Sequence, residues 1–96
     1  MPCSVQKAER PKYVRLVVID AIQAVSAPGA IVQLATSLGW NGLGHTAVKR
    51  KMYREQIATR LAERGCVMRT LTPNNFVDTK ITTVEHVAEL VEKDLG

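Results

Sequence analysis

Two histidines and two cysteines are the side chains of this 96-residue chain best suited to nucleophilic or metal chemistry. His45 and His86 lie 41 positions apart, with no Cys, Asp or Glu at metal-ligand spacing around either. Cys3 and Cys66 lie 63 positions apart, which matches no metal-binding or redox motif. The sequence therefore predicts no catalytic residue, no metal site, no cofactor and no enzyme.

The cysteines are expected to be reduced. Cys66 follows Gly65 and opens an apolar segment, which is typical of a buried free thiol. Nothing else indicates an oxidising compartment, so a disulfide with Cys3 is not expected. No apolar run approaches the roughly 18 residues of a membrane span, and the N-terminus lacks a signal-peptide pattern. We expect a cytoplasmic protein, in the host cytoplasm if it is viral.

The most distinctive segment is the basic stretch GHTAVKRKMYREQIATRLAERG. Its residues 45–64 hold six basic and two acidic side chains, a net charge of +4 that equals the net charge of the whole chain. Residues 28–44 carry no charged side chain, and residues 78–96 carry two basic and five acidic ones. A basic middle and an acidic end indicate two different surfaces, of which the basic one suits nucleic acid.

Hydrophobic spacing and turn residues indicate one domain over residues 12–96, behind a flexible tail formed by residues 1–11. Thr46 and Gly65 are expected to cap the basic helix, and Thr82 or Thr83 to cap the last helix. Helices are predicted over 12–25, 30–38, 46–64 and 83–95, and a β-hairpin is predicted from the runs 66–72 and 76–82.

The first helix has a rival interpretation, because YVRLVVI is rich in β-branched residues and could form a strand. The continuation of helical spacing through residues 21–25 favours the helix.

The basic helix raises a further question, because Arg50 and Arg54 share a face with Tyr53, Ile57 and Leu61 at about 100° per residue. Either the helix breaks near Met52, or its N-terminal half projects beyond the core and holds its cations in solvent.

A family resemblance is carried by the end of this helix. Ile57, Leu61 and Gly65, followed by Cys66-Val67-Met68, resemble the recognition-helix-to-wing junction of winged-helix regulators, including the MarR-like kind. Upstream, residues 34–39 (LATSLG) resemble the helix that precedes the turn. The resemblance implies an α+β, mostly helical winged helix-turn-helix fold, with helix 46–64 in the major groove of duplex DNA and the hairpin as the wing. The stretch between Gly39 and Gly65 is longer than that family usually has.

The residues expected to contact DNA combine charge with a helix N-terminus, where lysine suits phosphates and arginine can also read guanine. Thr46 and the first helical amides could hold one phosphate. The glycines of residues 39–44 do not match a phosphate-binding loop, and a turn is the better interpretation. The candidate DNA-binding residues are His45, Thr46, Lys49, Arg50, Lys51, Arg54 and Arg69.

The expected function is duplex-DNA binding, either sequence-specific or architectural, by a small transcriptional regulator or a replication or partition factor. Structured RNA stays open as the nucleic acid. A homodimer is expected through the terminal helices, because they carry apolar faces. The alternative is a small non-enzymatic inhibitor or adaptor that places the basic helix on an acidic protein surface. Neither function involves a membrane.

Overall fold

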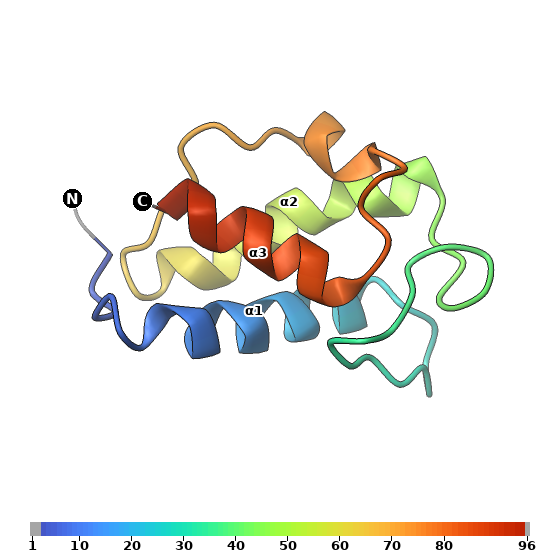
Figure 1. The fold of residues 1–96 in the computed structure, drawn as a ribbon, viewed down its shortest axis with the longest axis horizontal. Coiled ribbons are helices and arrows are strands. Elements are labelled where there is room, and N and C mark those ends of the chain that lie inside the picture. Colours follow the sequence, from blue (N-terminus) through green and yellow to red (C-terminus); the bar gives the residue numbers. More distant parts are fainter. Residues whose placement is uncertain (1–2, 96) are drawn as a thin grey trace.

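The computed structural model describes residues 3–95, which form three α-helices and a short 3-10 helix. α1 runs antiparallel to α2 and α3 and packs against both, and η1 covers part of α2 (Figure 1). The described residues form no strand, and a single antiparallel bridge joins Ser37 to Thr83. The elements are α1 (Arg10–Ala24), α2 (Ala47–Ala62), η1 (Pro73–Val77) and α3 (Val84–Leu95).

The helices predicted over 12–25, 46–64 and 83–95 are confirmed, with ends shifted by at most two residues. Residues close in sequence account for the start of α3 and for the end of α2. Thr83 Oγ1 accepts a hydrogen bond from the His86 N–H at 3.3 Å and so caps α3. Gly65 has φ +72°, and its N–H donates to the Ala62 carbonyl at 3.0 Å, which ends the last turn of α2.

The predicted β-hairpin is wrong. Thr72 and Asn75 cap η1 where the hairpin turn was expected, because the Asn75 side-chain oxygen accepts from the Thr72 N–H at 2.7 Å. The 3-10 turn places Phe76 in the core against Tyr53, with ring centroids 6.5 Å apart. The two flanking runs therefore do not pair. In place of a β-ladder, side chains from elsewhere bind the main chain of these runs. One of them is the Asp94 carboxylate, which accepts a hydrogen bond from the Thr70 N–H at 3.0 Å.

The predicted helix over 30–38 is also wrong. This segment is irregular, with a turn at residues 33–36, and it lies beside the start of α3, because the Val84 N–H donates to the Thr36 carbonyl at 3.1 Å and the Leu38 N–H donates to the Thr82 carbonyl at 2.9 Å. Those bonds occupy main-chain groups that a helix would have used internally. Without a helix before α2 and without a wing, the predicted winged helix-turn-helix fold is wrong, and the molecule is a small helical protein.

The N-terminal segment corrects the expectation of reduced cysteines, since Cys3 and Cys66 form a disulfide. Ser4 brings the two ends together, because its N–H donates to the Arg64 carbonyl at 3.0 Å. Val5 is buried in the core. Of the segment expected as a tail, Cys3 and Val5 thus contact the rest of the protein, whereas residues 6–9 are exposed. Residues 1 and 2 of that tail lie outside the described residues.

Candidate functional site

The basic helix α2 turns Arg50 inward. This side chain is only 9% exposed, and its guanidinium donates to the Ile81 carbonyl at 2.9 Å and to the Asp78 carbonyl at 3.2 Å. The helix is therefore neither broken near Met52 nor extended beyond the core. Instead, Arg50 lies in the buried face and satisfies main-chain groups of the segment that follows η1. A contact with an outside ligand would require these bonds to break.

Two further cations of α2 also contact the main chain. Arg54 Nε donates to the Leu71 carbonyl at 3.2 Å, and this side chain is half-buried. Lys49 Nζ donates at 2.9 Å to the carbonyl of Val25, the residue that caps the C-terminus of α1. A cation there interacts favourably with the helix dipole. Lys49, Arg50 and Arg54 thus bind main-chain carbonyls of the protein itself, and of these only Lys49 is exposed, as is Lys51.

The outward side of α2 is less basic than its sequence suggests. Val48 is 72% exposed and Met52 is 46% exposed, and they lie one turn apart on the same side of the helix. Lys51 and Glu55 are exposed beside them. We call Val48, Lys51 and Met52 the outer face of α2. It has an apolar centre with a cation next to it.

His45 lies immediately before α2, in a buried hydrogen-bonded group. Its Nδ1 contacts the Tyr53 hydroxyl, and its Nε2 lies 3.2 Å from Ser26 Oγ. Burial lowers the pKa of His45, and the nearby cations Lys49 and Arg50 lower it further. Burial raises the pKa of Tyr53 well above its ordinary value. His45 is thus a neutral core residue at neutral pH, whereas it was expected beside DNA.

The direction of the hydrogen bonds around His45 determines whether His45 could activate Ser26 as a nucleophile. Ser26 Oγ has one proton and donates it to the Ile22 carbonyl at 2.6 Å. Its oxygen therefore accepts from His45 Nε2–H, and His45 Nδ1 accepts from the Tyr53 hydroxyl. A histidine in this state cannot take the serine proton, so the arrangement is not that of an activated nucleophile. No cluster of three or more potential metal ligands occurs within residues 3–95.

His45 makes stability depend on pH in a defined direction. Its pKa in the folded protein lies below the ordinary value of about 6.5, so on acidification the unfolded chain takes up a proton first. The free energy of unfolding is therefore expected to fall as the pH drops from about 7.5 to about 5.5. Urea unfolding of wild type and of His45→Gln, at fixed ionic strength, measures this dependence.

The matched control is His86→Gln, which removes the only other histidine of the chain. His86→Gln is expected to keep the acid dependence, and His45→Gln to lose it. The same dependence in all three proteins would contradict this role of His45.

The other two candidate residues are exposed. Thr46 occupies the N-cap position of α2, but its side chain makes no capping hydrogen bond. Arg69 lies at a bend in the irregular segment after α2. The structure thus leaves Thr46, Lys49, Lys51 and Arg69 at the surface, half-buries Arg54, and places Arg50 and His45 in the interior.

Trp40 is a surface residue in the turn that was predicted over residues 39–44. It is 93% exposed, the most exposed of the large hydrophobic residues. It lies in the loop of residues 37–44, which leads towards α2 (Figure 1). No local signal in the sequence distinguishes a tryptophan that a loop displays from one that a loop buries.

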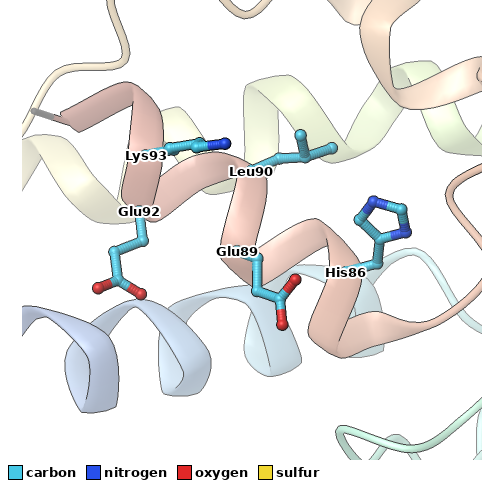
Figure 2. Close-up of a pocket in the computed structure, with 5 residues that line it drawn as sticks. All are labelled: His86, Glu89, Leu90, Glu92 and Lys93. Carbon is cyan, nitrogen blue, oxygen red and sulfur yellow. The ribbon is translucent and has the colours of Figure 1, made fainter.

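A hollow of about 450 Å³ lies over the exposed side of α3. Figure 2 shows that its labelled side chains all come from this one helix and do not converge on a common point. Binding sites for small ligands usually place a few polar groups around a shared centre, which is absent here. The lining residues are His86, Glu89, Leu90, Glu92 and Lys93.

Comparison of the chain with protein-family models, with curated proteins and with solved structures finds no match. Within the part of the chain that the structure describes, no helix is long and apolar enough to cross a membrane.

Proposed function

We infer that this chain is a small non-enzymatic adaptor or inhibitor that binds an acidic protein surface through the outer face of α2. The observation that carries this proposal is the orientation of the helix. α2 directs Arg50 into the protein and exposes Val48 and Met52 to solvent.

An apolar centre with charged residues at its edge is the usual anatomy of a protein–protein interface. Val48 and Met52 supply the apolar centre, and Lys51 lies at its edge. Methionine suits such a surface because its flexible, polarisable side chain adapts to the partner.

The charge of the molecule favours an acidic partner. Of its thirteen lysines and arginines, only Arg15 forms a salt bridge within residues 3–95, with Glu85 at 3.7 Å and Glu92 at 3.9 Å. The exposed cations Lys51, Arg69 and Lys80 form no salt bridge in the part of the chain that the structure describes. Such cations accelerate encounter with an acidic surface and reject a basic one.

Duplex-DNA binding stays a prediction, and the outer face supports it less well. A DNA groove offers phosphates and base edges, with thymine methyls as its main apolar groups. Val48 and Met52 would meet few apolar partners there. A protein surface offers apolar side chains to both.

Binding to two defined probes by fluorescence anisotropy tests the proposal. The first probe is a labelled amphipathic helix of about 20 residues with a leucine stripe flanked by glutamates, and the second is a random-sequence DNA duplex of similar length. Wild type is expected to prefer the acidic peptide. Val48→Asp/Met52→Asp is expected to weaken peptide binding by at least about tenfold, because it removes the apolar centre and repels the glutamates.

The matched control is Thr59→Asp, which adds a carboxylate to an exposed position further along α2. It is expected to leave most of the peptide affinity. A duplex bound more tightly than the peptide, with a salt dependence that Lys49→Ala/Lys51→Ala makes shallower, would overturn the proposal in favour of DNA. Arg50 is left intact in these variants because it supports the fold.

A further inference from the structure

The disulfide between Cys3 and Cys66 fastens the start of the chain to the end of α2. Figure 1 shows the N-terminal segment beside the loop that follows α2, at the end of the molecule where α2 and α3 both finish. We call residues 3–5 the N-terminal strap. Its behaviour without the disulfide depends on the other contacts that hold it.

The hydrogen bonds from the N-terminal strap to α2 converge on one acceptor. The Ser4 N–H donates to the Arg64 carbonyl at 3.0 Å, and the Ser4 hydroxyl donates to the same oxygen. Val5 adds one buried side chain, which is 5% exposed. The Val5 carbonyl accepts from Arg10 Nε at 3.2 Å, but Arg10 is close in sequence and does not tie the strap to α2. The disulfide is therefore the strongest link between the strap and α2.

The two sulfur atoms of the disulfide differ in accessibility. Cys66 is 1% exposed, whereas Cys3 is only partly buried. An attacking thiolate therefore reaches Cys3 Sγ, and Cys66 Sγ leaves as a thiolate that takes up a proton from water. With a dithiol as the reductant, its second thiol attacks the resulting mixed disulfide and frees Cys3. The protein gains two thiols, and the dithiol is oxidised to a disulfide.

Reduction also adds a hydrogen-bond donor beside the strap. Cys66 Sγ lies 3.7 Å from the Arg64 carbonyl oxygen, so the thiol formed by reduction can donate to that oxygen. A carbonyl oxygen has two lone pairs, and the two Ser4 donors already use both. The new thiol therefore competes with Ser4 for its acceptor.

We propose that the Cys3–Cys66 disulfide is a redox-controlled clasp, which a dithiol reductant opens so that the N-terminal strap leaves α2 while the helices stay folded. The helices remain because α1 packs directly against α2 and α3. Release of the strap uncovers the place that Val5 fills in the core. The clasp follows the last turn of α2, whereas the outer face lies in the first half of that helix, so the two proposals are independent.

Nuclear magnetic resonance relaxation of the ¹⁵N-labelled full chain, before and after addition of dithiothreitol, tests the proposal. In the oxidised protein, the amides of Ser4 and Val5 are expected to have order parameters near about 0.85, as in rigid backbone. After reduction, their order parameters are expected to fall below about 0.6, while those of α1, α2 and α3 stay near the first value. Removal of the reductant and reoxidation are expected to restore the original spectrum.

Two variants separate loss of the disulfide from other effects. Cys3→Ser keeps the Cys66 thiol and is expected to have a mobile strap without reductant. Ser4→Ala is the matched control, because it removes one bond to the Arg64 carbonyl but keeps the disulfide, and its strap is expected to stay ordered in the oxidised protein.

Three results would overturn the proposal, with thiol labelling used to follow the state of both cysteines. The first is a strap that stays rigid although both cysteines are reduced. The second is a loss of order in the helices together with the strap, which would make the bond a support of the whole fold and not a clasp. The third is a disulfide that dithiothreitol opens only after the protein has been unfolded.

Discussion

Replacing Arg50 by methionine is expected to lower the free energy of unfolding by about 3 kcal/mol, because one buried and one partly buried carbonyl lose a charged donor while the aliphatic stem of the side chain is kept. These carbonyls belong to Asp78 and Ile81, and no β-ladder is present to bind them. Urea unfolding at neutral pH, monitored by circular dichroism, measures the change.

The control for Arg50→Met is Lys51→Met, which removes the next cation of the same helix. Lys51 is exposed, so its replacement is expected to change the free energy of unfolding by less than about 0.5 kcal/mol. Equal effects of the two substitutions would contradict the structural role of Arg50. The comparison also matters for function, since lost binding in an Arg50 variant would reflect a damaged fold.

Opening the Cys3–Cys66 disulfide is expected to destabilise the protein strongly. The bond closes a loop with a sequence separation of 63 residues. A loop of this length restricts the unfolded chain enough to contribute about 4 kcal/mol to stability. Cys3→Ser is therefore expected to lower the free energy of unfolding by roughly 2–4 kcal/mol, measured by urea unfolding under oxidising conditions.

A reductant separates the disulfide from other effects of this substitution. It is expected to bring wild type down to the stability of Cys3→Ser and to leave Cys3→Ser unchanged. Two free thiols in unreduced wild type, found by thiol labelling and mass spectrometry, would show that the bond does not form.

The sequence by itself determined the three helices, because their signals are local. Thr83 caps α3, Gly65 ends α2, and hydrophobic spacing marks the buried stripe of each helix. The capping bonds and the spacing connect residues only a few positions apart, so they can be recognised without knowing what the helix packs against.

Only the tertiary structure decided the segments between the helices. Residues 30–38 have helical spacing, yet they pair with residues 82–85, which are distant in sequence. The runs around Pro73 are rich in strand-forming residues, yet their carbonyls bind Arg50 and Arg54. In both segments, bonds between distant residues outweigh a local preference.

The burial or exposure of the candidate binding residues also depends on contacts between segments that are distant in sequence. The sequence identified a basic helix and placed Arg50 on the same face as Tyr53 and Ile57. The sequence did not show which groups could form hydrogen bonds with the guanidinium of an arginine buried in the core. The carbonyl groups of the distant residues Asp78 and Ile81 supply that partner, so the helix keeps its full length and buries the charge. The exposure of Trp40 and the pairing of Cys3 with Cys66 likewise depend on which segments meet in space, and helical or strand spacing does not encode that.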